Sequence, residues 1–173
     1  RLEYRGGDTN NHLINNARAL YIAGCYLCDE DILAVGRSIL EQESERMFFE
    51  SGFLREGSSH YQLLLARTFL EVIWFAKKNS DTVFLLAIED RVKKIWHAAC
   101  FFLQDYQFPV FGDLSPDFTP DFHFGIGVVG SLLFGEKSVA QIVDGNGWHT
   151  LFPGVNEYVV SNDVGSVKGL TAY

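Results

Sequence analysis

The stretch that decides the fold runs from residue 82 to residue 102 and reads Thr-Val-Phe-Leu-Leu-Ala-Ile-Glu-Asp-Arg-Val-Lys-Lys-Ile-Trp-His-Ala-Ala-Cys-Phe-Phe. Its apolar residues recur at steps of three and four, namely Phe84, Ile88, Val92, Ile95, Ala99 and Phe102. This spacing places them along one stripe of an α-helix. The stretch therefore predicts a long amphipathic helix, for which Ser80 or Asp81 can supply the N-cap.

The same periodicity occurs near the start of the chain and predicts a helix from Asn11 to about Leu27. The apolar positions that indicate this helix are Leu13, Ala17, Leu20, Tyr21 and Gly24. Thr9 or Asn10 can supply its N-cap, because short polar side chains accept hydrogen bonds from the first helical amides.

Two more helices lie between these segments. Asp29 is expected to cap a helix that continues to about Phe49. Ser59-His-Tyr-Gln62 matches the Ser-x-x-Gln capping box, so Ser59 is expected to cap a third helix that ends near Lys78. Four helices with short connections predict a mainly α fold made of two consecutive antiparallel helical hairpins.

The pattern changes after Tyr106. Residues 108–120 hold three of the four prolines and predict a loop or linker. Residues 126–143 are compatible with one or two short helices, and residues 157–160 with a strand. We expect one helical domain over residues 1–145 and an irregular or partly β tail or linker over residues 146–173.

Composition and charge narrow the classes of function. The 173 residues are 47% hydrophobic with a net charge of −8, which predicts one domain with a sizeable core and weighs against nucleic acid as a partner. The apolar stretch from Gly125 to Gly135 is too short to span a membrane. The chain opens with Arg1 and its only methionine is Met47, so we expect a fragment or a processed product.

Cysteine and histidine positions do not predict a metal site. Cys25-Tyr-Leu-Cys28 has the spacing of a metal or redox pair, but it lies inside a helical pattern and no second pair follows. We interpret both cysteines as small buried helix residues. The spacing of the later histidines does not match that of zinc ligands, and no cofactor is expected.

Three side chains at two predicted helix starts suggest a chemistry. Asn11 and His12 open one apolar helix, and Tyr61 lies in the first turn of another. Unpaired backbone amides and the positive end of the helix dipole favour an anion there. Alternate helices in a stack of hairpins run parallel, so both starts are expected at one end of the molecule.

Amide, imidazole and phenol groups are suited to removing a proton from the carbon beside a sugar carboxylate. Asn11 can donate to the carboxylate, His12 can donate or accept, and Tyr61 can transfer the proton. A phenol serves as a base only when positive charge lies nearby, which Arg5 or Arg55 can supply. A single polar residue at a helix start is more often a cap or a packing group. The functional hypothesis therefore rests on the three residues together rather than on any one of them.

Four segments in order resemble a known family. They are Asn10-Asn-His-Leu-Ile-Asn-Asn-Ala-Arg-Ala-Leu-Tyr-Ile-Ala-Gly24, Ile39-Leu-Glu-Gln-Glu43, Phe53-Leu-Arg-Glu-Gly-Ser-Ser-His-Tyr-Gln62 and Phe111-Gly-Asp-Leu-Ser-Pro-Asp-Phe118. Together they resemble the helical domain of heparinase II/III-type polysaccharide lyases over residues 8–120.

The resemblance implies an incomplete (α/α) toroid that normally precedes a β-sandwich domain. It also implies β-elimination on a uronic-acid-containing glycan, with catalytic Asn11, His12 and Tyr61. Substrate-binding positions would be Arg5, Arg55, Glu56 and His60. The acidic polysaccharide would be the partner, and a periplasmic or cell-envelope location is favoured. The family usually takes a further histidine, and sometimes a metal, from the β-sandwich.

Two other functions remain open at this stage. An inverting glycosidase on an (α/α) toroid would use Glu56, Asp113 or Asp117 as acid and base, with the two carboxyl groups roughly 6.5–9.5 Å apart. A non-catalytic helical module would bind a glycan or support an assembly, and its polar helix starts would serve only as caps. The reaction product distinguishes the lyase from the glycosidase and from the non-catalytic module, because only elimination leaves an unsaturated sugar.

Overall fold

A computed structural model describes residues 11–102, 112–114, 125–136, 158–159 and 170–171 of the chain. This described part is mainly helical, as the sequence predicted. Its helices are α1 (His12–Leu27), α2 (Glu30–Arg46), α3 (Ser59–Lys78), α4 (Thr82–Phe101) and α5 (Gly125–Phe134). A pair of two-residue strands, β1 (Tyr158–Val159) and β2 (Leu170–Thr171), is antiparallel.

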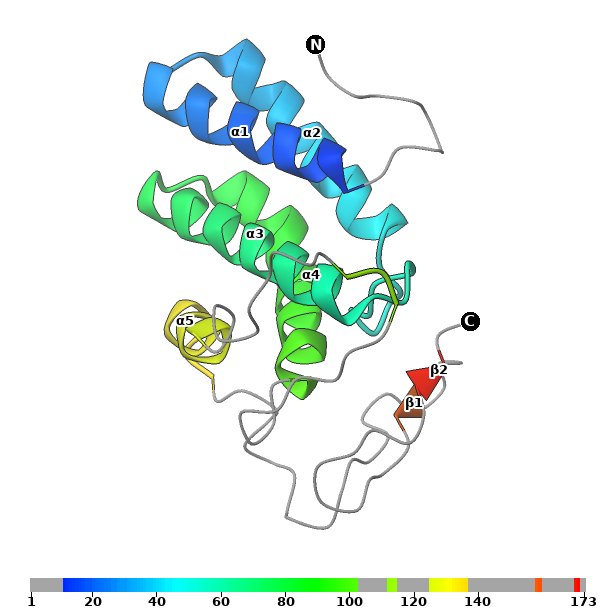
Figure 1. Cartoon of the computed structure of the whole chain (residues 1–173). Coiled ribbons are helices and arrows are strands. Elements are labelled where there is room, and N and C mark those ends of the chain that lie inside the picture. The colour runs from blue at the N-terminus through cyan, green and yellow to red at the C-terminus, as the bar shows by residue number, and fades with distance from the viewer. Residues whose placement is uncertain (1–10, 103–111, 115–124, 137–157, 160–169, 172–173) are drawn as a thin grey trace.

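The first four helices form two consecutive hairpins, which confirms the predicted arrangement (Figure 1). α1 and α3 both begin on the right of the view and run to the left, where each turns into the next helix. Alternate helices are therefore parallel, and the starts of α1 and α3 lie at the same end. We call this the head end, and the end that carries the α1–α2 and α3–α4 turns is the tail end.

Close packing joins the two helices of the first hairpin. A Cβ atom at Gly24 would lie 2.7 Å from the Leu33 backbone nitrogen, and one at Gly36 would lie 2.7 Å from the Tyr21 backbone nitrogen. Such approaches are far inside ordinary contact distances, so only glycine lets the two backbones come together at these points. The pair of glycines explains why α1 and α2 pack over their tail-end halves.

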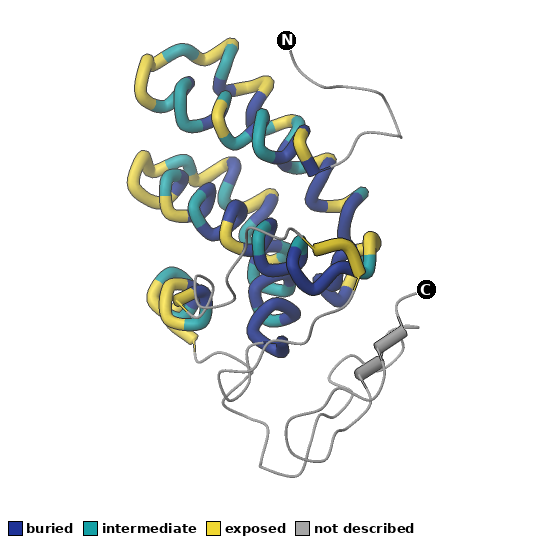
Figure 2. Tube along the Cα trace, viewed as in Figure 1, coloured by how far each residue is buried: buried dark blue, intermediate teal, exposed yellow. Residues whose placement is uncertain are grey.

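The core lies between the hairpins and along the predicted stripe of α4 (Figure 2). All six stripe residues are buried, which confirms the helical periodicity of the opening stretch. α5 packs against α3 and α4, and the indole nitrogen of Trp96 donates to the Ile126 carbonyl at 3.0 Å. Among the largest fully buried side chains are Trp96, Tyr21, Phe48, Phe69 and Phe84.

The caps of α2 and α4 agree with the predictions, and the cap of α3 differs by one residue, whereas the residues predicted to cap α1, Thr9 and Asn10, lie outside the described residues. Asp29 caps α2 by accepting from the amides of Asp31 and Ile32, and Asp81 rather than Ser80 caps α4. Ser58, not Ser59, caps α3. Ser58 caps the helix because its backbone is extended and its hydroxyl accepts from the Tyr61 amide, while Gln62 bonds to the loop before α3.

The C-terminal predictions are met only in part. α5 accounts for one helix inside the expected 126–143 region, and β1 falls within the expected strand at residues 157–160. The rest of the 146–173 tail lies outside the described residues. None of the described helices combines the length and apolar character needed to cross a membrane.

Candidate functional site

A buried glutamine shapes the loop that leads into α3. The Gln62 side chain is 1% exposed and accepts a hydrogen bond from the Leu54 amide at 2.6 Å. Its amide nitrogen donates to the carbonyls of Gly52 and Ile95, at 3.1 and 3.3 Å. This single side chain therefore holds the loop before α3 closed and ties it to α4. It thereby positions the first turn of α3, which contains Tyr61.

The cap of α3 also anchors a distant segment. The Ser58 hydroxyl accepts from the Tyr61 amide at 3.1 Å and donates to the Asp113 carbonyl at 2.6 Å. Gly112 has φ 73°, and a Cβ atom there would collide with the carbonyl oxygen of Gly57. Residues 112–114 thus lie directly against the head of α3, which brings Asp113 to the site.

The register of α1 against α3 follows from an ion pair. Arg18 donates to Glu71 at 2.6 Å, so these two residues lie side by side. His12 precedes Arg18 by six residues, and Tyr61 precedes Glu71 by ten. At a rise of about 1.5 Å per residue, Tyr61 lies roughly one helical turn beyond His12 along a parallel neighbour.

The predicted catalytic residues occupy the head end with different exposure. Asn11 is buried, and its own backbone is already helical (φ −53°, ψ −20°), so its side chain makes no cap hydrogen bond. His12 is the first residue of α1 and is exposed. Tyr61 is half-buried in the first turn of α3, where it packs against the core. His12 and Tyr61 lie in the first turns of their helices as predicted, whereas Asn11 precedes α1 at the N-cap position instead of being its first residue.

His60 is buried rather than open to solvent. It is 4% exposed, and its ring meets the Tyr61 ring edge to face at a centroid distance of 5.0 Å. Burial lowers the pKa of His60, while the nearby Asp113 carboxylate opposes that shift. A neutral imidazole therefore lies behind Tyr61, and the substrate-binding role expected for His60 does not fit its burial.

Arg55, another predicted substrate-binding residue, borders the same head. Arg55 is exposed, and its guanidinium carbon lies 4.2 Å from the centroid of the Phe49 ring. Arg5 and the alternative acid Asp117 lie outside the described residues.

Glu56 is an exposed residue with a partly desolvated carboxyl group. This desolvation raises the pKa of Glu56, Asp113 raises the same pKa by like-charge repulsion, and Arg46 opposes both effects. Glu56 and Asp113 are thus electrostatic neighbours at the α3 head.

The tail end holds a different arrangement, which the sequence did not predict. Asp81 accepts from Arg37 at 2.8 Å, from the Tyr21 hydroxyl at 3.0 Å and from the Phe84 amide at 3.4 Å. A single carboxylate therefore caps α4 and joins it to both helices of the first hairpin. We call these three residues, Asp81, Arg37 and Tyr21, the tail clamp.

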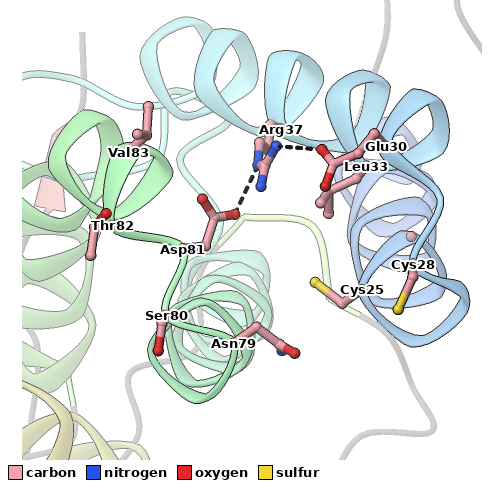
Figure 3. A pocket seen from close by; sticks show the side chains of 11 residues that line it. Cys25, Cys28, Glu30, Leu33, Arg37, Asn79, Ser80, Asp81, Thr82 and Val83 are labelled. Carbon is pink, nitrogen blue, oxygen red and sulfur yellow. Dashed lines mark hydrogen bonds and ion pairs between the residues drawn. The ribbon is translucent and has the colours of Figure 1, made fainter.

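Two residues of the tail clamp, Asp81 and Arg37, line a polar cavity of about 320 Å³ (Figure 3). Cys25 and Cys28 line the same cavity, Cys25 half-buried and Cys28 exposed. The expectation that both cysteines are buried helix residues is wrong for Cys28, because it ends α1 in the left-handed conformation, with φ 55°. That backbone turns its side chain away from the helix.

Within the described residues, no group of three or more histidine, cysteine, aspartate or glutamate side chains is arranged to hold a metal ion. Comparison of the chain with models of known protein families, with curated proteins and with solved structures finds no match. The local geometry and the resemblance of the sequence segments are therefore the basis for a functional proposal.

Proposed function

We propose that the chain is part of a polysaccharide lyase that cleaves a uronic-acid-containing glycan by β-elimination, with its helices forming an incomplete (α/α) toroid. The site is the head end of α1 and α3. The observation that carries the proposal is the register set by Arg18 and Glu71. It offsets His12 from Tyr61 by about one helical turn, measured along the axes of the parallel helices α1 and α3.

The proposed roles follow from the chemistry of each group. Elimination requires neutralisation of the sugar carboxylate, removal of the proton beside it, and protonation of the departing glycosidic oxygen. Asn11 supports the first step, because its amide is not spent on capping and lies where the helix dipole favours an anion. Tyr61 transfers the proton and His12 assists by donating or accepting.

Groups around Tyr61 favour this assignment. The neutral His60 ring contacts the Tyr61 ring edge to face and adds no charge beside it. Arg55 is exposed on the loop before α3 and adds the only predicted cation among the described substrate-binding positions. A carboxylated sugar approaching the head end meets the exposed imidazole of His12 and guanidinium of Arg55, whereas the Asn11 amide is only 7% exposed.

One observation favours the glycosidase as a second candidate. Glu56 and Asp113 are electrostatic neighbours, and burial raises the pKa of Glu56, which is the property required of a general acid. Hydrolysis would use this carboxyl pair and would not need Tyr61. The two candidates therefore assign the chemistry to different residues of the same head.

Product formation on a panel of uronate glycans tests the proposal. Tyr61→Phe keeps the ring packing and removes the hydroxyl, so it should lower the rate of near-ultraviolet product formation by about 10²-fold or more. Asn11→Ala should also lower the rate, because carboxylate neutralisation is lost. Glu56→Gln should retain more activity than either variant, and thermal melts of all three would show that folding is preserved.

The outcomes separate the candidates. Full activity in Tyr61→Phe together with an inactive Glu56→Gln, and reducing ends released without an unsaturated product, would replace elimination with hydrolysis. Binding of the glycan by every variant with no product of either kind in the wild type would indicate the non-catalytic module.

A further inference from the structure

Two thiols face one cavity at the tail end. Cys25 lies in the last turn of α1 and Cys28 directly follows the helix, and both line the cavity beside the tail clamp (Figure 3). Neither cysteine is part of a disulfide, and the third cysteine, Cys100, is buried in α4. The pair is therefore separate from the candidate site at the head end.

Helix geometry places the pair at disulfide distance. Residues three apart in an α-helix have Cα atoms about 5 Å apart, by its rise and radius. This value lies within the range of roughly 4.4–6.8 Å that disulfides span. Because Cys28 has left-handed backbone angles, its side chain is freed from the helical direction while its Cα keeps the helical position. The Cα separation thus permits a bridge, which forms once the exposed Cys28 side chain rotates its sulfur toward Cys25.

We propose that Cys25 and Cys28 form a redox-active dithiol site that takes up a reversible disulfide from low-molecular-weight disulfides such as oxidised glutathione. The exposed Cys28 thiolate attacks the glutathione disulfide, forms a mixed disulfide and releases one glutathione thiolate. The Cys25 thiolate then attacks the Cys28 sulfur and releases the second. Two cysteine thiols are oxidised, one glutathione disulfide is reduced to two glutathione molecules, and the two thiol protons pass to the leaving thiolates.

The order of the two attacks follows from the environment of each thiol. Cys28 is exposed, so it meets a soluble disulfide first. Burial raises the pKa of the Cys25 thiol, whereas a hydrogen bond with Tyr21 opposes that shift, so Cys25 is the slower, resolving thiol.

The pair also touches the tail clamp. Tyr21 hydrogen-bonds to Asp81 and interacts with Cys25. Oxidation consumes the Cys25 thiol, so the Tyr21 hydroxyl loses that partner while keeping Asp81. Oxidation of the pair therefore changes the hydrogen bonds of Tyr21, which lies at the junction of the two hairpins.

Peptide mapping after incubation with a series of reduced and oxidised glutathione ratios tests the site on the chain itself. Trypsin cleavage after Arg18 and Arg37 releases residues 19–37 with both cysteines, whereas Cys100 falls in residues 95–137. After alkylation, the 19–37 peptide should lack two hydrogens and carry no alkyl group as the oxidised ratio rises. Dithiothreitol should restore it, and the 95–137 peptide should remain unoxidised.

Serine variants provide the controls. Cys25→Ser should accumulate a persistent glutathione adduct on Cys28, because the resolving thiol is missing. Cys28→Ser should stay largely unmodified, and Cys100→Ser should behave as the wild type. A wild-type chain that stays reduced in excess oxidised glutathione, keeps a stable adduct on Cys28, or links into covalent dimers would overturn the proposal.

Discussion

At the head end, neutral hydrogen bonds fix the chain, whereas at the tail end an ion pair joins the helices. Gln62 holds the loop before α3 through one amide and two carbonyls, all of them backbone groups. At the tail, Asp81 and Arg37 are opposite charges, and the Asp81 side chain is 8% exposed. Uncharged anchors therefore position the α3 head, where the carboxylates Glu56 and Asp113 lie, while the tail clamp joins the two hairpins.

The largest expected effect is at the head. Gln62→Leu should lower the free energy of unfolding by about 3 kcal/mol, because the buried Leu54 amide and two carbonyls lose their partner. Urea denaturation measures this loss in the free energy of unfolding. Gln42→Leu is the matched control, since Gln42 is exposed and donates to Ser38 within its own helix, and it should change stability by no more than about 0.5 kcal/mol. Equal effects in the two variants would mean that Gln62 does not anchor the loop.

A smaller loss is expected at the tail. Asp81→Asn keeps a capping side chain but removes the charge that faces Arg37, which should cost about 1–2 kcal/mol for this partly buried pair. Asp90→Asn is the control, because Asp90 is highly exposed beside Lys94 and should have no measurable effect. If Asp81→Asn were as stable as the wild type in the same urea titration, the clamp would not join the hairpins.

The head should also respond to acid. Burial lowers the pKa of His60 in the folded chain below its unfolded value of about 6.5. The unfolded chain then binds more protons, so the stability from neutral His60 is complete above pH 6.5 and is lost as pH falls through the lower folded pKa. Burial shifts the pKa of His97 in the same direction.

Thermal melts between pH 7.5 and pH 5.5 check this sign. The melting temperature of the wild type should fall as the pH is lowered, and the fall should be smaller in His60→Gln. His97→Gln should also reduce it, and the double variant should reduce it most. An identical pH dependence in all four proteins would show that neither imidazole is linked to folding in this range.

The helices could be predicted from the sequence because their apolar positions repeat over many turns, as the stripe from Phe84 to Phe102 does. The caps of α3 and α4 were harder, since neighbouring polar residues compete and the winner depends on tertiary contacts. Ser58 caps α3 because its hydroxyl also donates a hydrogen bond to the Asp113 carbonyl. Asp81 rather than Ser80 caps α4 because its carboxylate also accepts from Arg37 and Tyr21.

The sequence could predict where the candidate site residues lie along their helices, but not how deeply they are buried or which residues surround them. Helix starts placed Asn11, His12 and Tyr61 at one end because alternate helices in stacked hairpins are parallel. The burial of His60 and the approach of Asp113 depend on contacts between residues more than fifty positions apart, which no local pattern encodes. Cys28 is exposed because it lies at the end of α1, where the chain turns through a left-handed backbone conformation.

The most direct test of a shared head-end site is an NMR titration of the isotope-labelled chain with a uronate oligosaccharide. The backbone amides of residues 11–13 and 59–62 should shift together and saturate at the same ligand concentration. A neutral oligosaccharide of equal length should leave them unchanged. Shifts at only one of the two helix starts, shifts confined to the tail cavity, or equal responses to the neutral sugar would contradict a single carboxylate-binding site formed by α1 and α3.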